Sequence, residues 1–323
     1  MHQCWRIEAF ETAHGEMAAR QRLEMFGEGV IDRGARSGAD KRHGLCGGFL
    51  RHHDSKAGAE ETDEAHESRR ALLRRRRGSG VFLLVGGVYG TFMSLDLFFL
   101  FFFYEIAVLP MYLLIGVWGS STDFGTFKRT KEYGAMKLTL VLVAGSIPVW
   151  VAIIATFLNA GLRSMDLPLL AQVHFSRDFQ LLFYPCYMIG FGILAGLFPF
   201  HTWSPDGHVA APSAVSMLHA GVLMKLGAFG IIRVGMLLFP EGAVYWTPLL
   251  MLLATANVLY GALSALGQKD LKYVIGYSSV SHMGYVLMGF AALSTVAMKG
   301  AVLQMASHGI MTALFFTLVG VVY

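Results

Sequence analysis

A lysine lies inside one of the most apolar stretches of the chain. The segment from Leu197 reads LFPFHTWSPDGHVAAPSAVSMLHAGVLMKLGAFGIIR, and Lys225 follows thirteen residues after Pro212, where its second apolar run begins. About 20 apolar residues rising 1.5 Å each span a bilayer, so we expect Lys225 near the midplane. A charge at that depth is costly and is retained only with a partner, with water or for a task. The pattern therefore favours an ion pathway over a soluble enzyme.

The same segment predicts a broken helix. The first apolar run reaches Pro199 and gives way to a polar loop that contains His201, Asp206 and His208, before the second run starts. Non-helical backbone at membrane depth is tolerated only against protein or a water-filled cavity. Its backbone groups and the helix ends beside it can bind ions or water. Just before this break, Gly192 and Gly196 form a G-x-x-x-G step, which predicts close packing against a neighbouring helix.

The remainder of the chain divides into two unlike parts. Charged residues make up 15% of the sequence, against about 25% in soluble domains, and residues 1–80 hold 28 of the 48 charged side chains. From Val81 onward the chain is hydrophobic, which predicts an all-α polytopic membrane domain over 81–323. The expected spans are 81–95, 97–118, 134–158, 179–200, 212–238, 246–266, 272–291 and 294–321.

Residues 1–80 have three interpretations. They could be a soluble extension, they could include a basic patch for anionic lipid at Arg69–Arg77, or they could come from a wrongly assigned start or a shifted reading frame. The abrupt change at Val81 favours the third. We expect a polar segment that is disordered or mis-assigned and forms no packed domain.

Basic residues gather in the loops of one side. Loops 119–133 and 267–271, with the start of the following helix, carry five Lys or Arg, whereas the opposite loops carry only Arg163 and Arg177. The positive-inside rule then places 119–133 and 267–271 in the cytoplasm or its equivalent.

Ionisable side chains recur at mid-span depth. Each of these residues could instead have a purely structural role. It could be a protonated acid that packs helices, a member of an ion pair, a buried histidine with its hydrogen bonds made, or a lysine that snorkels to the interface. Groups of this kind on separate helices at similar depth can exchange protons through intervening water. The predicted proton-pathway residues are Glu105, Lys225, His282, His308, His219 and Lys137.

The sequence offers nothing that would hold a redox cofactor. Its glycines lack a strand–turn–helix context, and no phosphate-binding loop, Cys-x-x-Cys pair or Ser-His-Asp setting occurs. The three cysteines (Cys4, Cys46 and Cys186) have no metal-ligand spacing. We expect no cofactor, metal or nucleic acid to bind this chain, and expect a lipid bilayer around it.

Four segments resemble a known family in order and spacing. They are FFFYEIAVLPMYLLIGVWG (101–119), PFHTWSPDGHVAAPSAV (199–215), AGVLMKLGAFGIIR (220–233) and DLKYVIGYSSVSHMG (270–284). They resemble the antiporter-like subunits of respiratory complex I, in particular subunit 4 (chain M). The resemblance covers about 81–323 and implies fourteen core helices in two inverted five-helix repeats, with broken helices and a central polar axis.

The resemblance also implies roles for individual residues. Glu105 matches the family's helix-5 glutamate, Lys225 its helix-8 lysine, and Lys137 a lysine on helix 6. His282 and His308 match histidines of the polar axis. The family's helix-7 lysine, the partner of the glutamate, is replaced by Leu194.

Further departures concern the extent of the chain, which is expected to stop after about helix 11. The broken helix 12 is then absent, and a polar segment stands where helices 1–3 are expected.

The leading hypothesis is a proton-translocating, non-redox membrane-arm subunit of NADH:quinone oxidoreductase. NADH, FMN, iron–sulfur clusters and quinone would belong to partner subunits, and neighbouring antiporter-like subunits would be direct partners. Alternatives are a subunit of a multi-subunit Na⁺/H⁺ antiporter or membrane-bound hydrogenase, or a structural subunit without conduction. A bacterial plasma membrane is expected, with the mitochondrial inner membrane as the alternative.

Overall fold

The computed structural model describes residues 44–123, 128–161 and 164–322. It forms two units, residues 1–67 and 68–323, and the second is described below by itself. Helix α2 (Gly44–Met93) begins in the first unit and continues into the second. The boundary expected at residue 80 lies inside this helix, and residues 1–43 lie outside the described residues. The nature of the segment 1–80 therefore stays a prediction.

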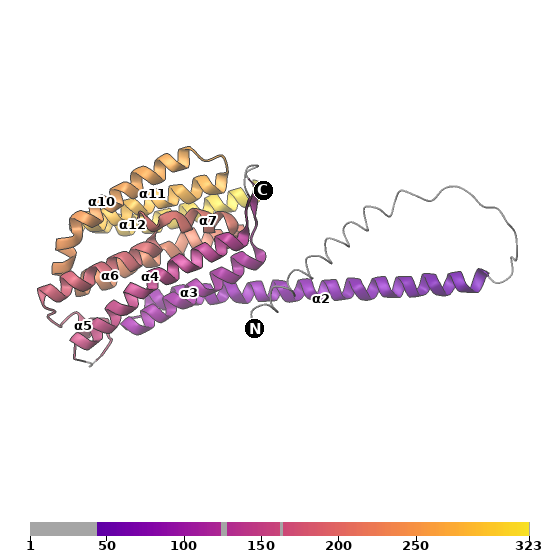
Figure 1. Cartoon of the computed structure of the whole chain (residues 1–323), viewed down its shortest axis with the longest axis horizontal. Coiled ribbons are helices and arrows are strands. Elements are labelled where there is room, and N and C mark those ends of the chain that lie inside the picture. Colours follow the sequence, from indigo (N-terminus) through magenta and orange to yellow (C-terminus); the bar gives the residue numbers. More distant parts are fainter. Residues whose placement is uncertain (1–43, 124–127, 162–163, 323) are drawn as a thin grey trace, which may run out of the picture. The chain divides into compact units, whose positions relative to one another are not determined.

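The second unit is a bundle of helices that run side by side (Figure 1). After α2 come α3 (Leu97–Trp118), α4 (Lys131–Asn159), α5 (Leu167–Leu170), α6 (Arg177–Ala195), η1 (Phe200–Thr202), α7 (Trp203–Ala210), α8 (Ser213–Leu218), η2 (His219–Leu223), α9 (Met224–Gly230), η3 (Ile231–Met236), α10 (Pro240–Leu266), α11 (Leu271–Ala291) and α12 (Thr295–Val322). The prediction of an all-α polytopic membrane protein is confirmed.

Six helical segments of the described chain are long and apolar enough to cross a membrane. They are Leu97–Trp118, Lys131–Asn159, Arg177–Ala210, Ser213–Met236, Pro240–Leu266 and Thr295–Val322. The predicted spans 81–95 and 272–291 are not among them. Residues 81–93 are the end of α2, and 272–291 fall in α11, so both stretches are helical.

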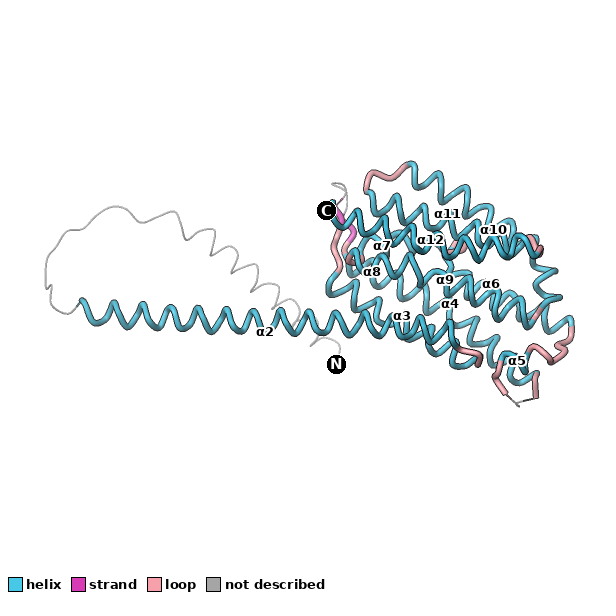
Figure 2. The backbone as a smooth tube through the Cα atoms, turned by 180° about the vertical axis from the view of Figure 1, so that it is seen from behind, coloured by secondary structure: helices cyan, strands magenta, loops and turns pink. Residues whose placement is uncertain are grey.

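The turn around α5 joins two distant segments. The backbone N–H of Leu97 donates to the carbonyl of Met165, and that of Leu167 to the carbonyl of Leu95, both at 2.8 Å. A two-strand hairpin, β1 (Thr122–Asp123) and β2 (Lys128–Arg129), lies at the opposite end of the bundle from α5 (Figure 2).

Polar residues fix where three of these helices begin. Asp96, Thr130 and Asp270 precede α3, α4 and α11, and each side chain accepts hydrogen bonds from backbone N–H groups of the first turn. Such caps satisfy donors that have no partner within the helix. They mark the ends of the apolar runs more sharply than hydropathy does.

The last turns of α2 pack antiparallel to α3. A Cβ at Gly87 would contact the backbone of Ala107 at 2.6 Å, and one at Gly80 would contact Leu114 at 3.1 Å. As the residue number rises in α2 it falls in α3, so the two helices run in opposite directions. The close approach at Gly87 leaves no space for a side chain.

The predicted break is present, but the predicted polar loop is wrong. Helix α6 ends at Ala195, the following Gly196 has a left-handed φ of 81°, and a short η1 turn leads into α7. Asp206 and His208 lie on α7, which is a helix with every residue buried. Pro205 occupies the first turn of α7, where a missing N–H costs no hydrogen bond, so turn-forming residues can build a helix here.

The backbone at this break is satisfied by a side chain from α10. Asn257, which is fully buried, donates from its amide nitrogen to the Gly196 carbonyl at 2.9 Å. Its amide oxygen accepts from the Phe198 N–H at 2.6 Å. An unpaired backbone group in a membrane interior costs several kcal/mol, so Asn257 makes the broken helix tolerable.

The prediction that the Gly192 and Gly196 step packs closely against a neighbouring helix is wrong. A Cβ at Gly192 would meet Leu197 of its own turn at 2.8 Å, and Gly196 ends the helix. The close interhelical approach uses other glycines. A Cβ at Gly190 would lie 2.6 Å from the Gly145 carbonyl of α4, and one at Gly227 of α9 would lie 2.5 Å from the Ala195 nitrogen of α6.

Candidate functional site

Lys225 makes two polar contacts in the bundle interior. Its side chain is 4% exposed, and Nζ donates to the carbonyl of Ala220 one turn earlier. Nζ also lies 2.7 Å from Nδ1 of His308 on α12. An ammonium group can only donate, so with charged Lys225 the imidazole nitrogen is the acceptor and Nε2 carries the ring proton. One proton is thus shared between two groups that can both exist charged or neutral.

Small residues allow this contact. A Cβ at Gly309 would lie 2.8 Å from the Gly221 carbonyl, and one at Gly221 would lie 3.3 Å from the Gly309 carbonyl. The two helices therefore approach backbone to backbone next to Lys225 and His308. The π-helical turn η2 covers this part of the Lys225 helix, and such turns often occur at functional sites.

His282 extends the contact to a third helix. Its ring centroid lies 5.1 Å from that of His308, and its Nδ1 lies 3.0 Å from the side-chain nitrogen of Gln304. Gln304 and His308 are four residues apart and share one face of α12. The order Lys225, His308, His282 therefore joins α9, α12 and α11 in one layer.

A second histidine pair lies on α7 and η2. The ring centroids of His208 and His219 are 4.0 Å apart, and both residues are fully buried. None of their four ring nitrogens has a hydrogen-bond partner among the described residues. Nearly all buried polar atoms in proteins are hydrogen-bonded, to protein or to water, so these nitrogens are suited to water. The His208 ring also lies 5.6 Å from the Phe316 ring of α12, measured between centroids.

Asp206 on α7 gathers two cations. Its Oδ2 lies 2.7 Å from Nζ of Lys137, and its Oδ1 accepts from Arg129 and from the Tyr273 hydroxyl, the latter at 3.1 Å. Asp206 is 5% exposed, whereas Lys137 and Arg129 are 23% and 37% exposed. Burial, the largest single influence, lowers the pKa of Arg129, but the charges and hydrogen bonds of Asp206 and Tyr273 together leave that pKa raised. Lys137, in the second turn of α4, is therefore held in an ion pair with Asp206.

Glu105 lies apart from these groups. Its Oε1 accepts from the Ser146 hydroxyl, and the Tyr104 hydroxyl lies 3.2 Å from the Ser146 oxygen. Within the described part of the chain the ion pairs involve Asp206 alone, so Glu105 has no basic partner there. Leu194, where the resemblance expects a lysine, is fully buried. The Ser146 hydroxyl therefore hydrogen-bonds this carboxyl group directly, and the Tyr104 hydroxyl contacts it only through Ser146.

His201 completes the broken-helix segment. Its ring stacks on Phe198 at a centroid distance of 5.5 Å and lies 4.8 Å from the Tyr260 ring. Both ring nitrogens are buried without a partner in the described residues. Pro199 precedes η1 and contributes shape rather than a polar group.

The structure brings most of the predicted residues into four groups. Lys225, His308 and His282 form the first, His208 and His219 the second, and Lys137 and Asp206 the third, while Glu105 lies alone beside Ser146. Sequence reasoning missed the side chains that position them: Tyr104, Ser146, Asn257, Tyr273 and Gln304. Each is a polar residue inside an apolar run, which was the available signal. The described residues contain no group of three or more metal-ligating side chains.

Known proteins resemble this chain over its membrane part. The model of the NADH:quinone oxidoreductase/Mrp antiporter transmembrane family matches residues 94–323. NAD(P)H-quinone oxidoreductase chain 4 3 of Picosynechococcus sp. is 42% identical over 242 residues, which are 75% of this chain and 42% of that protein. A chain 4 2 of Thermosynechococcus vestitus is 39% identical, over 72% of this chain and 42% of its own length.

Solved structures show the same fold. A chain of respiratory complex I from Thermus thermophilus superposes with a TM-score of 0.71 at 27% identity, over 78% of this chain and 52% of that one. A chain of the Mrp complex from Dietzia sp. superposes with a TM-score of 0.64 at 22% identity, over 75% and 44%. The chain spans about half the length, or less, of the relatives it matches. It belongs to the NADH:quinone oxidoreductase/Mrp antiporter transmembrane family.

Proposed function

We propose that this chain is a proton-translocating, non-redox membrane subunit of a complex I-type NADH:quinone oxidoreductase. The observation that carries the proposal is the 2.7 Å contact between Lys225 Nζ and His308 Nδ1 in the membrane interior. A lysine held in a low-dielectric site can lose its proton near neutrality, as other buried lysines do. The neighbouring imidazole is then a proton acceptor within hydrogen-bond distance.

The proton moves as follows. Lys225 passes a proton to Nδ1 of His308, which leaves a neutral amine and an imidazolium ring. The ring then releases the proton on Nε2, which has no protein partner among the described residues, toward His282 or water. His282 receives it beside Gln304, and Lys225 is reprotonated from the His208 and His219 side. Each step conserves charge and needs no redox group.

Glu105 and the Asp206 group have different roles in this scheme. Glu105 takes up or releases a proton on α3, where the Ser146 hydroxyl donates to it and the Tyr104 hydroxyl contacts Ser146. The Asp206 carboxylate holds Lys137 and Arg129, so that these cations neither block nor repel a proton in the central layer. His201, whose ring stacks on Phe198, adds a further protonatable side chain at the break.

The redox reaction belongs to other subunits in this proposal. Relatives of this chain are named as chains of NAD(P)H-quinone oxidoreductases, and the sequence offers no site for their cofactors. NADH, FMN, iron–sulfur clusters and quinone would be bound by partner subunits, and neighbouring antiporter-like subunits would adjoin this chain. A bacterial plasma or thylakoid membrane fits the cyanobacterial relatives, with the mitochondrial inner membrane as the alternative.

A second candidate is a subunit of an Mrp-type cation/proton antiporter or of a related respiratory membrane complex. The Mrp chain and a chain of a membrane-bound sulfane sulfur reductase share the fold, with TM-scores of 0.64 and 0.66. The 42% identity to an oxidoreductase chain, against 22% to the Mrp chain, favours the first proposal. A structural subunit without conduction is the third alternative.

Substitution of Lys225 tests the proposal in the assembled complex. Vesicles that contain the complex with Lys225→Met are expected to oxidise NADH in the presence of an uncoupler at the wild-type rate. They should acidify several-fold less per electron, because one pathway is closed. Lys299→Met is the matched control, since this exposed lysine lies on α12 away from the contact. An unchanged proton yield in the Lys225 variant would favour the structural alternative.

A further inference from the structure

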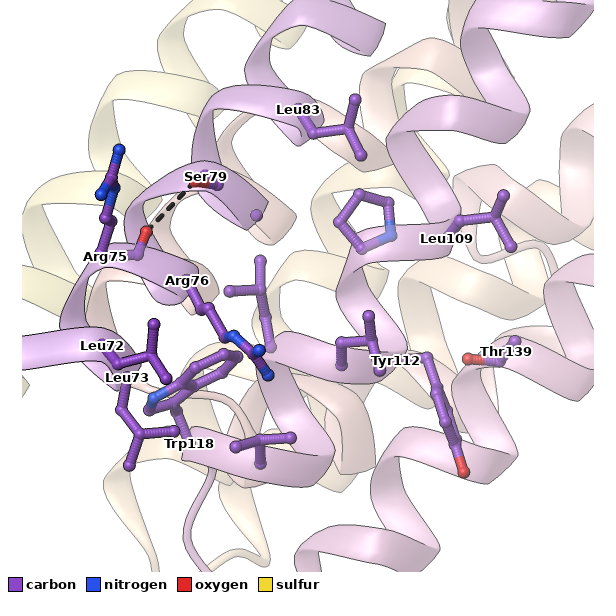
Figure 3. A pocket seen from close by; sticks show the side chains of 15 residues that line it. Leu72, Leu73, Arg75, Arg76, Ser79, Leu83, Leu109, Tyr112, Trp118 and Thr139 are labelled. Atoms are coloured by element: carbon purple, nitrogen blue, oxygen red, sulfur yellow. Dashed lines mark hydrogen bonds between the residues drawn. The ribbon is translucent and has the colours of Figure 1, made fainter. Parts of the chain in front are cut away.

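A cavity of about 870 Å³ opens between the end of α2 and α3, within the unit 68–323. Its walls are mostly apolar, with Leu72, Leu83 and Leu109 among them, and Arg75 and Arg76 also line it. In Figure 3 the Arg75 side chain points away from that of Arg76. Figure 3 also shows Arg76 extending past Trp118. Cavities that take small molecules commonly have volumes of about 300–1,000 Å³. The feature is separate from the proton groups of the bundle interior.

The two arginines lie at the level of one membrane face. Helices α2 and α3 run antiparallel, with Gly80 against Leu114, so residues before Gly80 lie beside the end of α3. Helix α3 ends at Trp118, and the basic loop that contains Lys128 and Arg129 follows. Trp and Tyr are enriched at the headgroup level of membranes, and both Tyr112 and Trp118 line this cavity.

The positive charge at this end is not balanced within the described residues. The ion pairs found there are those of Asp206, and no carboxylate pairs with Arg74–Arg77. Four consecutive arginines beside an anionic leaflet attract its lipids, and a guanidinium group binds phosphate oxygens in a two-point geometry. The apolar walls are themselves exposed, since Leu83 is 53% and Leu109 is 58% exposed. An occupant must combine a negative headgroup with a long apolar part.

We propose that this cavity binds an anionic phospholipid, with the phosphate at Arg76 and one acyl chain along the groove between α2 and α3. Of the three interpretations of residues 1–80, the proposal takes the second, a basic patch for anionic lipid at Arg69–Arg77. A zwitterionic lipid offers the same apolar chain without net negative charge and binds less well. The bound lipid would join the end of α2 to α3 at the membrane face where the basic loops lie. Charge complementarity at one end and an apolar wall at the other thus specify one amphiphile.

Photolabelling of the assembled complex tests this proposal. The complex is incorporated into nanodiscs that contain phosphatidylglycerol with a diazirine in its acyl chain, irradiated and digested, and adducts are mapped by mass spectrometry. We expect adducts within residues 109–118 of α3. Phosphatidylcholine with the same diazirine chain should give several-fold fewer. Excess unlabelled phosphatidylglycerol should compete, which needs no variant of the protein.

Two matched double variants separate a site from general attraction. Arg75→Gln with Arg76→Gln removes the charges that line the cavity, whereas Arg74→Gln with Arg77→Gln removes equal charge from the same helix outside it. A basic residue at an anionic surface contributes about 1 kcal/mol, or about fivefold in affinity. The first pair should lose up to about thirtyfold, and the second much less.

Three outcomes would overturn the proposal. Equal labelling by the two lipids would show an ordinary lipid contact without headgroup recognition. Equal loss in both double variants would show general electrostatic attraction. Adducts on a partner subunit instead of α3 would show that a protein segment covers the groove.

Discussion

Nζ of Lys225 and Nδ1 of His308 lie 2.7 Å apart, although 83 residues separate them in the sequence. The contact exists because Gly221 and Gly309 let their helices approach without side chains between them. It pairs a basic amine with an imidazole in a site that solvent scarcely reaches. Apolar packing does not explain why these two ionisable side chains are buried. Together they form the simplest unit that can pass a proton.

His308→Gln should block that transfer while retaining a polar side chain of similar size. Glutamine can accept from Lys225 but cannot be protonated near neutral pH. Positioned proton-transfer groups typically contribute about 10²–10⁴ in rate, so flux through this subunit should fall at least about a hundredfold. Proton yield per NADH oxidised, measured in vesicles, reports the change. The exposed residue His174, replaced by Gln, is the control and should behave as wild type.

Glu105→Gln should lower proton pumping and leave assembly largely intact. The substitution keeps the shape and the hydrogen bond from Ser146 but removes the exchangeable proton. We expect about tenfold less proton flux with a normal amount of assembled complex on native gels. Glu132→Gln, at an exposed position in the first turn of α4, serves as control. Wild-type pumping by the Glu105 variant would assign this carboxyl group to helix packing.

Asp206→Asn should destabilise the assembled chain. It leaves Lys137 and Arg129 without their carboxylate, and because both cations are partly exposed, we expect a loss of about 1–3 kcal/mol. Thermal unfolding of the purified complex would register it as a lower midpoint. The double variant with Lys137→Met should lose less than the sum of the two single variants, since the pair is coupled. Strict additivity would contradict the ion pair.

The membrane helices were predictable because apolar runs of bilayer length leave little choice of structure. Lys225, Glu105 and the histidines were also visible, since an ionisable residue at mid-span is conspicuous. Their partners were not, because a helical period gives the face of a residue but not which helix will oppose that face. The helix α7 was missed for another reason: Ser204, Pro205 and Asp206 are typical of turns, and tertiary burial overrode that preference.

Asn257→Leu should weaken the break that follows α6. Leucine has a similar volume but leaves the Gly196 carbonyl and the Phe198 N–H without partners. Each unsatisfied buried group costs about 1–3 kcal/mol, so the loss should be about 2–6 kcal/mol, visible as a lower thermal midpoint. Thr255→Val on the same helix is the control, because that hydroxyl bonds only within α10. An equal effect in both variants would contradict the role of Asn257.

Lys225→Arg distinguishes a lysine that passes protons from one that is a fixed charge. Arginine keeps the positive charge and hydrogen-bonding capacity but stays protonated at any working pH, so it cannot pass a proton on. The measurement is the proton yield per NADH oxidised by the assembled complex in sealed vesicles, with uncoupled NADH oxidation as the check on integrity. We expect Lys225→Arg to pump as poorly as Lys225→Met while uncoupled oxidation is retained. A wild-type proton yield with arginine would contradict it, because Lys225 would then be a fixed charge and the relay would have to run through His282 and His308 alone.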